Sequence, residues 1–85
     1  MRLVFSREAW EDYLYWHKTD RKMVERIHEL IKDACRTPHS GIGKPEPLRH
    51  VMQGYWSRRI DQEHRFVYKV AGQVMLIAQL RHHYA

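Results

Sequence analysis

The chain has 85 residues and a formal net charge of +5, from 15 Lys and Arg against 10 Asp and Glu. A chain of this length buries only roughly 60% of its unfolded surface on folding, so we expect one domain over residues 1–85. The positive charge favours a polyanion or an acidic protein as partner. The single cysteine excludes an internal disulfide framework. Because the sequence shows neither a membrane-spanning apolar run nor a signal peptide, we expect a cytoplasmic protein with no membrane association.

The first half of the sequence is typical of one strand followed by two helices. Ser6 suits a helix N-cap, because its hydroxyl can accept a hydrogen bond from the first turn. Thr19 or Asp20 supplies a second cap between two segments whose apolar residues recur at helical spacing. The predicted elements are a strand at 2–5, a helix at 7–18 and a helix from 21 to about 35.

The second half is typical of β-structure. It begins after a loop over 37–47, where three prolines and two glycines break both periodicities. The predicted strands are at 48–51, 55–61, 64–70 and 73–82, with turns at 53–54, 61–63 and 71–72. Together the two halves predict an α+β fold, βαα followed by an antiparallel β-meander, with two helices packed on one face of a small sheet.

Alternation along the predicted strands separates an apolar face from a largely basic one. Trp56 and Ile60 lie on the first face, whereas Arg59 and Arg65 lie on the second. The last predicted strand is apolar on both faces, which indicates a position inside the sheet, beside the strand at 2–5.

Several kinds of catalytic site have no support in the sequence. The seven histidines show no HExxH spacing and Cys35 stands alone, so we expect no metal site. Gly41 and Gly43 open no helix, which argues against a phosphate-binding loop and a nucleotide cofactor. The serines lack the context of a nucleophile elbow. We therefore expect no cofactor.

The remaining chemistry is that of an acid, a base and cations without a metal. RNA can be cleaved by such a set, because its 2′-hydroxyl is an internal nucleophile. A general base removes the hydroxyl proton, a cation stabilises the phosphoryl oxygens and a general acid protonates the departing 5′-oxygen. The candidate residues are Glu46 in the proline-rich loop, Arg59 and Arg65 on predicted strands, and Arg81, His83 and Tyr84 near the C-terminus.

The same residues have simpler interpretations. A glutamate in a proline-rich loop is usually solvated, and arginines on a strand usually form an ordinary basic face. A terminal His-His-Tyr is often only a tail. Spacing alone therefore leaves three hypotheses open: a ribonuclease, a non-catalytic RNA- or DNA-binding module and a protein-interaction domain.

Ordered motifs along the chain carry a resemblance to a known family. They are SREAWEDYLYW, RIHELIKD, RTPHSGIGKPEPL, GYWSRRI, EHRFVY and the closing RHHY. Together they resemble the YoeB toxins, a family of the RelE-like superfamily in bacterial type II toxin–antitoxin systems. The resemblance implies a RelE-like fold and a ribosome-dependent mRNA endoribonuclease that acts in the ribosomal A site, beside the 16S rRNA, and inhibits translation.

The resemblance also implies partners. It predicts neutralisation by an acidic YefM-like antitoxin, a homodimer, and contact with DNA only through the antitoxin complex. The competing hypothesis is a binding module that has lost cleavage and serves as the basic partner of such an antitoxin.

Site residues follow from the resemblance motif by motif. Glu46 of KPEPL matches the general base, Arg65 of EHR the arginine that stabilises the transition state, and His83 of HHY the general acid.

Further matches concern substrate binding. Arg59 of SRRI and Tyr84 match positions that bind the phosphate and order the substrate. Arg49 stands where the family often has lysine, so the charge is kept with a different donor geometry at a phosphate contact. Ala85 follows the tyrosine that usually ends the family's chains.

The predicted turn at 71–72 tests these roles. With a two-residue turn there, Arg65 shares a face with His82 rather than with His83. The catalytic interpretation therefore predicts a three-residue turn, a bulge that shifts the register, or a strand that ends before His83.

Overall fold

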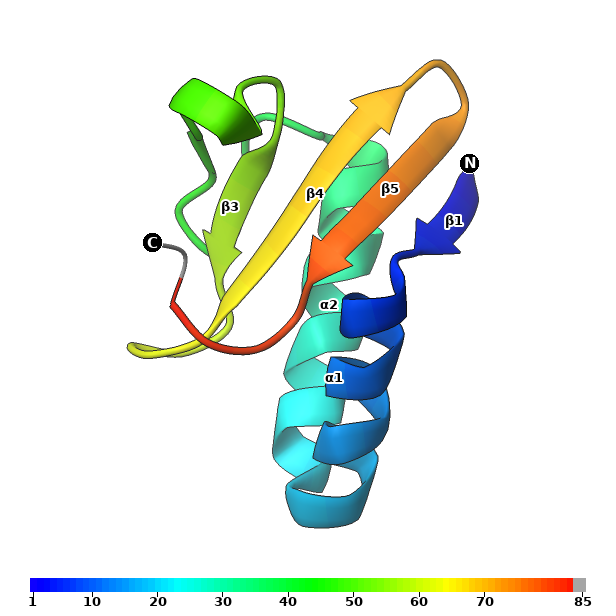
Figure 1. The fold of residues 1–85 in the computed structure, drawn as a ribbon, viewed down its shortest axis with the longest axis vertical. Coiled ribbons are helices and arrows are strands. Elements are labelled where there is room, and N and C mark those ends of the chain that lie inside the picture. Colours follow the sequence, from blue (N-terminus) through cyan, green and yellow to red (C-terminus); the bar gives the residue numbers. More distant parts are fainter. Residues whose placement is uncertain (84–85) are drawn as a thin grey trace.

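The computed structural model describes residues 1–83, which form two helices and a five-stranded sheet (Figure 1). The elements are β1 (Arg2–Phe5), α1 (Arg7–Thr19), α2 (Arg21–Arg36), β2 (Glu46–Pro47), the 3-10 helix η1 (His50–Met52), β3 (Trp56–Arg59), β4 (Arg65–Ala71) and β5 (Val74–Gln79). The predicted α+β class, with βαα followed by an antiparallel meander, is confirmed.

Side-chain caps fix where the two helices begin. The Ala9 N–H donates to Ser6 Oγ at 3.0 Å, and the Lys22 N–H donates to Asp20 Oδ1 at 3.1 Å. Each cap satisfies a backbone donor that has no partner within its helix. Asp20 serves twice, because it also ends α1. Neither helix is both long and apolar enough to cross a membrane, as far as residues 1–83 are concerned.

The sheet joins the first strand to the last. Its order is β1-β5-β4-β3-β2, with β1 parallel to β5 and every other neighbouring pair antiparallel. β5 thus has a hydrogen-bonded neighbour on each side, which agrees with a strand that is apolar on both faces. Its predicted pairing with residues 2–5 is confirmed.

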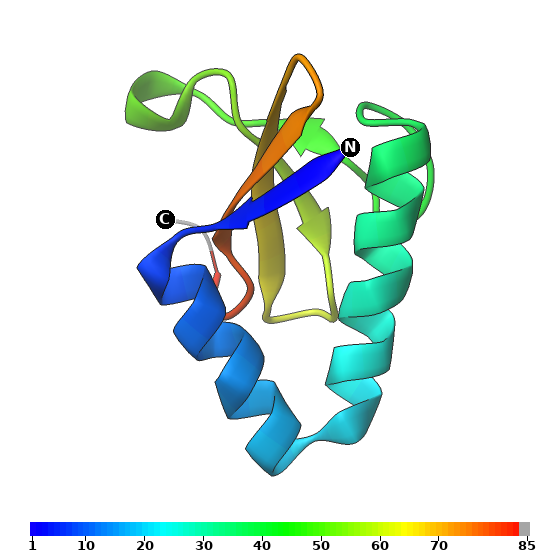
Figure 2. The same cartoon turned by 90° about the vertical axis from the view of Figure 1, so that its right-hand side faces the viewer.

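One face of the sheet carries the hydrophobic core. α2 runs along this face, and α1 packs against β1 and β5 (Figure 2). η1 and the segment after β5 lie on the other side of the sheet in the same view. Each large apolar side chain in the core contributes about 1.5 to 3 kcal/mol by leaving water. The core includes Ala9, Trp16, Val24, Ile27, Leu30, Ile31, Ala34, Ile60, Phe66, Tyr68, Met75, Ile77 and Leu80.

The prediction of a strand at 48–51 is wrong. Residues 49–54 instead form the loop of the β2–β3 hairpin, which closes where the Leu48 N–H donates to the Tyr55 carbonyl at 2.9 Å. His50 has a φ of 59°, a left-handed conformation that is incompatible with a strand. The chain must reverse within this short span, and that requirement overrides the β-prone side chains.

The β4–β5 hairpin turns one residue later than predicted, because Ala71 lies opposite Val74. A bulge between Val67 and Tyr68 then shifts the register by a further residue. β5 ends at Gln79, earlier than the predicted end at residue 82. The bulge and the early end are both among the alternatives that the catalytic interpretation predicts.

Candidate functional site

Strand pairing brings three of the predicted site residues onto one face of the sheet. Glu46 lies opposite Ser57, and Arg59 lies opposite Arg65. Ser57 and Arg59 are two residues apart on β3, so their side chains point to the same face. Their partners on β2 and β4 point the same way. Because Phe66 next to Arg65 enters the core, this is the face opposite α2.

Glu46 and Arg65 form the central contact of this face. Arg65 Nη1 lies 3.9 Å from Glu46 Oε1, close enough for an ion pair but too far for a hydrogen bond. The Glu46 side chain is 62% exposed, whereas the Arg65 side chain is only 10% exposed. The carboxylate is therefore accessible to a large substrate, and the guanidinium lies beneath it.

Arg65 is under-satisfied within the part of the chain that the structure describes. Its Nε and Nη1 atoms are buried and have no hydrogen-bond partner there. Buried donors without acceptors are costly, and Arg59 directly opposite adds a like charge that weakens strand pairing. An anion between the two arginines would relieve both penalties, because a phosphate accepts paired hydrogen bonds from a guanidinium.

The backbone at His82 reaches the same part of the sheet. The Arg65 N–H donates to the His82 carbonyl at 3.0 Å, so His83 follows directly after a residue that is bonded to β4. His83 is exposed and is the last described residue. Arg49 is exposed too, just before η1 in the loop that follows Glu46. Tyr84 lies outside the described residues.

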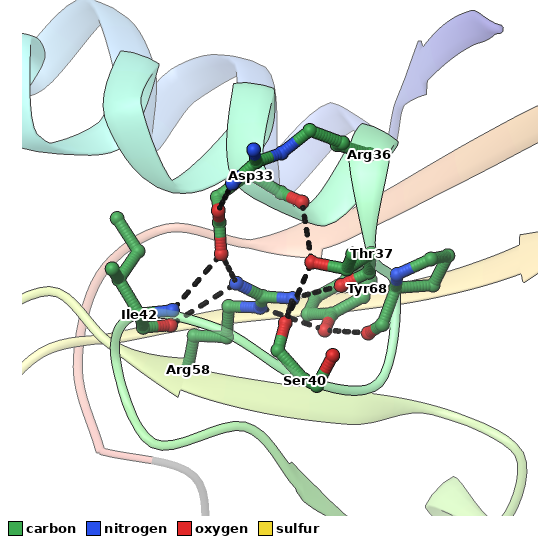
Figure 3. Close-up of polar contacts among 8 residues, drawn as sticks. Asp33, Arg36, Thr37, Ser40, Ile42, Arg58 and Tyr68 are labelled. Carbon is green, nitrogen blue, oxygen red and sulfur yellow. Dashed lines mark hydrogen bonds and ion pairs between the residues drawn. The ribbon is translucent and has the colours of Figure 1, made fainter.

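A buried arginine supports the loop that leads to Glu46 (Figure 3). Arg58 is fully buried on the helix-covered face, although the sequence had suggested an apolar face there. Its donors satisfy carbonyl groups of a loop without regular structure, as buried backbone requires. It donates to Asp33 Oδ2 at 2.7 Å, to Tyr68 Oη at 2.9 Å and to the carbonyl oxygens of Thr37, Ser40 and Ile42 at 2.7, 2.8 and 3.0 Å.

The same loop is joined to β3 just before β2 begins. The Arg59 N–H donates to the Gly43 carbonyl at 2.7 Å, and Gly43 has a φ of 80°. The Arg58 side chain and the Arg59 backbone thus both bind the connection between α2 and Glu46. Pro45 and Pro47 each restrict their own φ, and tertiary contacts fix the loop further.

Asp33 is the anionic partner in this network. Hydrogen bonds from Arg36, from the Ile42 N–H and from Arg58 lower the pKa of Asp33 from 3.8 to about 2. Burial raises the pKa of Tyr68, whose hydroxyl accepts from Arg58. Asp33 therefore stays ionised and Tyr68 stays neutral at neutral pH, which suits a structural role.

Sequence reasoning missed Arg58 and Asp33, although both left a signal. Arg58 stands between Trp56 and Ile60 in the alternation, so it belongs on the apolar face. Asp33 follows Leu30 by three residues and therefore borders the buried apolar side of α2, which carries Val24, Ile27, Leu30, Ile31 and Ala34. One charge on each of two apolar faces predicts a buried ion pair.

The chemistry of the face opposite α2 is that of a carboxylate, guanidinium groups and imidazoles. Over residues 1–83, no three His, Cys, Asp or Glu side chains are grouped so that they could hold a metal ion. A carboxylate in this setting can accept a proton, and the under-satisfied guanidinium beside it can stabilise an anion.

The whole chain is similar to known bacterial toxins. A family described as "YoeB-like toxin of bacterial type II toxin-antitoxin system" matches residues 5–84. Toxin YoeB of Escherichia coli (strain K12) is 57% identical over 84 residues, which cover 99% of this chain and 100% of that protein. The solved structure of a YoeB/ParE toxin from Agrobacterium tumefaciens aligns with a TM-score of 0.95 at 53% identity, covering 99% of this chain and 100% of that one.

Two solved structures from Staphylococcus aureus show relatives in assemblies. A YoeB dimer aligns with a TM-score of 0.93, and a heterotetrameric YoeB–YefM toxin–antitoxin complex aligns with 0.92. In both, the identity is 46%, and the match covers 99% of this chain and 98% of that one. The predicted RelE-like fold is confirmed. The chain belongs to the YoeB-like toxin family of bacterial type II toxin–antitoxin systems.

Proposed function

We propose that the protein is a metal-independent endoribonuclease that cleaves mRNA in the ribosomal A site and thereby inhibits translation. The observation that carries this proposal is the buried guanidinium of Arg65. Two of its nitrogens have no hydrogen-bond partner among residues 1–83, and it lies under the accessible carboxylate of Glu46. Cleavage by a 2′-hydroxyl needs a base, here Glu46, next to a cation that binds the phosphoryl group, here Arg65.

The reaction proceeds by transfer within the RNA. Glu46 removes the proton of the 2′-hydroxyl, and O2′ forms a bond to phosphorus while the bond from phosphorus to the 5′-oxygen breaks. The imidazolium of His83 gives its proton to the departing 5′-oxygen. The products are a 2′,3′-cyclic phosphate and a 5′-hydroxyl. Arg65 stabilises the negative charge that builds on the phosphoryl oxygens.

Substrate binding in this proposal falls to residues around that centre. Arg59 neutralises the phosphate from the neighbouring strand, Arg49 binds the backbone from the loop, and Tyr84 orders a base. The exposed setting of Glu46 favours ribosome dependence, because an open surface alone does little to orient RNA. The ribosome, with 16S rRNA beside the A site, would hold the message in place.

Partners follow from the relatives and from the surface. We propose that a YefM-like acidic antitoxin binds and neutralises the protein, that the free toxin forms a homodimer, and that DNA is contacted only through the antitoxin complex in the cytoplasm. The net charge of +5 suits an acidic partner. Exposed apolar side chains on β1 and α1 suit an interface with the antitoxin or with a second copy of the chain. They are Leu3, Val4, Trp10 and Leu14.

A cell-free translation reaction tests the activity. Purified protein should cut the message within the A-site codon, and Glu46→Gln should slow cutting by about 10² to 10⁴-fold, as expected for loss of a general base. Glu25→Gln, at an exposed position on α2, is the matched control. Intact message in the presence of wild-type protein would favour the binding module instead.

A further inference from the structure

The chain after β5 contains a residue in an unfavourable conformation. His82 has a φ of 71°, in the left-handed region that residues with a side chain rarely adopt. Such a conformation persists only where surrounding contacts determine it. His82 immediately precedes His83, so these contacts also determine where the chain enters His83.

Three hydrogen bonds hold the backbone of His82. Its N–H donates to Nδ1 of His64 at 2.8 Å. Its carbonyl accepts from the Arg65 N–H at 3.0 Å and from Gln79 Nε2 at 3.1 Å. Only one of the three, the bond to His64, depends on the protonation of a side chain.

His64 is itself held from two sides. Its side chain is 13% exposed, and its backbone N–H donates to Asp61 Oδ1 at 2.7 Å. The Trp16 ring packs against the imidazole in a T-shaped arrangement, with ring centroids 4.8 Å apart. Trp16 Nε1 also donates to the Leu80 carbonyl at 2.8 Å. α1 therefore braces both the imidazole and the segment that the imidazole holds.

The hydrogen bond from His82 requires one form of the His64 ring. Nδ1 accepts only when it carries no proton, so the neutral ring has its proton on Nε2. Nε2 lies on the side of Glu63, 3.6 Å from its Oε1. When Nδ1 gains a proton, two N–H groups face each other and the bond is lost.

We propose that His64 is a positioning residue for the catalytic acid. Its neutral imidazole keeps His82 in the left-handed conformation, and this directs His83 to the site beside Arg65. The proposal rests on the proposed function, because it assigns His64 to the placement of His83. His64 does not touch the RNA.

Titratable groups among residues 1–83 contact His64 or its turn from two segments. On its own turn they are Glu63 and Asp61, and on the C-terminal segment the nearest is the ring of His82, whose centroid lies 6.1 Å away. α1 contributes the uncharged Trp16, while its Asp12 accepts from the Leu80 N–H. The Arg81 guanidinium stacks on Tyr15 at 3.6 Å.

Nuclear magnetic resonance of the whole wild-type chain tests the geometry without any variant. The imidazole nitrogens of His64 should show the proton on Nε2, and the amide of His82 should be protected from exchange. Both signatures should disappear together as His64 is protonated at lower pH. A ring that carries its proton on Nδ1 at neutral pH, or an unprotected His82 amide, would overturn the proposal.

Two substitutions separate positioning from mere stability. His64→Asn places an amide oxygen as many bonds from Cα as Nδ1, so it should accept from His82 and cleave at a rate close to wild type. His64→Gln cannot place an acceptor there and should lower kcat by on the order of 100-fold, with KM little changed. His28→Gln, which alters a histidine on α2 that contacts Tyr13, should have no such effect.

A modified substrate identifies the affected step. If the 5′-bridging oxygen at the cleaved linkage is replaced by sulfur, the leaving thiolate needs no proton. His64→Gln should then cleave nearly as fast as wild type, as His83→Ala should. Two outcomes would refute the positioning role of His64. One is equal cleavage rates for His64→Asn and His64→Gln on normal RNA, and the other is a slow His64→Gln variant whose rate the sulfur substrate does not restore. Wild type that never cleaves would instead refute the proposed function, while the resonance data still decide the geometry.

Discussion

Arg58 Nη1 lies 2.7 Å from Asp33 Oδ2, in an ion pair that joins β3 to α2. Arg58 is fully buried, and its guanidinium also donates to the Tyr68 hydroxyl and to carbonyl groups of the loop between α2 and β2. Replacement of one partner therefore leaves several buried polar groups without hydrogen bonds.

We expect Arg58→Met to lower the free energy of unfolding by about 3 to 5 kcal/mol, the range for breaking a buried charged pair. Urea unfolding measures the loss. Arg59→Met, next to it on the exposed face, is the control and should change the midpoint little. Equal midpoints for the two variants would show that the network contributes nothing to stability.

Asp33 makes stability depend on pH at the acid end. Its pKa is about 2 in the folded protein against 3.8 for the free group. The unfolded chain thus binds the proton more tightly, so the contribution of Asp33 is fully present above about pH 4 and is lost as pH falls toward 2.

Asp33→Asn should remove this dependence. The difference in urea midpoint between wild type and variant should be largest above pH 4 and should shrink as pH approaches 2. A difference that stays constant over this window would mean that the carboxylate titrates as it does in the unfolded chain.

Gly43 lies where the loop passes over the core. A Cβ at this position would be 2.7 Å from Leu30 Cδ2 and 3.1 Å from Arg58 Cβ. Gly72 in the β4–β5 turn also has a positive φ, 61°, but a Cβ there would meet no heavy atom within 4 Å. Gly72→Ala should therefore show only the backbone penalty of roughly 1 to 2 kcal/mol.

Gly43→Ala should exceed that penalty, because a contact with the core is added to it. Thermal unfolding of the two variants side by side gives the comparison. If Gly43→Ala lowered the unfolding temperature less than Gly72→Ala, the loop would have to move away from Leu30 more easily than its hydrogen bonds suggest.

Arg65 should be more important for activity than for stability. Arg65→Met removes a buried cation whose Nε and Nη1 lack hydrogen-bond partners in the described chain and puts an apolar group of similar length in its place. We expect message cleavage to fall by about 10² to 10³-fold, while the urea midpoint stays level or rises. Loss of stability with activity retained would assign Arg65 to the fold alone.

The fold was largely predictable because its local signals agree with its packing. Ser6 and Asp20 begin the helices as their side-chain chemistry predicts. The segment at 48–51 was not predictable from its residue types, because His50 takes a left-handed conformation imposed by the hairpin closure. The hairpin register depends on the bulge at Val67 and Tyr68, and no single residue type predicts a bulge.

The candidate site was predictable in part. Alternation placed Arg59 and Arg65 on one face, and the pairing of β2 with β3 adds Glu46 to it. That pairing could not be read from the sequence, since the two residues of β2 are too short a segment to show a period. The roles of Glu46, Arg65 and His83 remain a proposal that rests on the family resemblance and on the geometry around Arg65.

The parallel pairing of β1 with β5 sets an order on biosynthesis. β1 is made well before its partner β5, which spans Val74–Gln79, and the Ser6 hydroxyl donates to the Ala78 carbonyl. A growing chain therefore cannot complete its sheet until β5 has left the ribosome. A nascent fragment that ends before β5 would lack both the β1–β5 pairing and His83, the proposed acid, so we expect cleavage activity to arise only after β5 and His83 have been made.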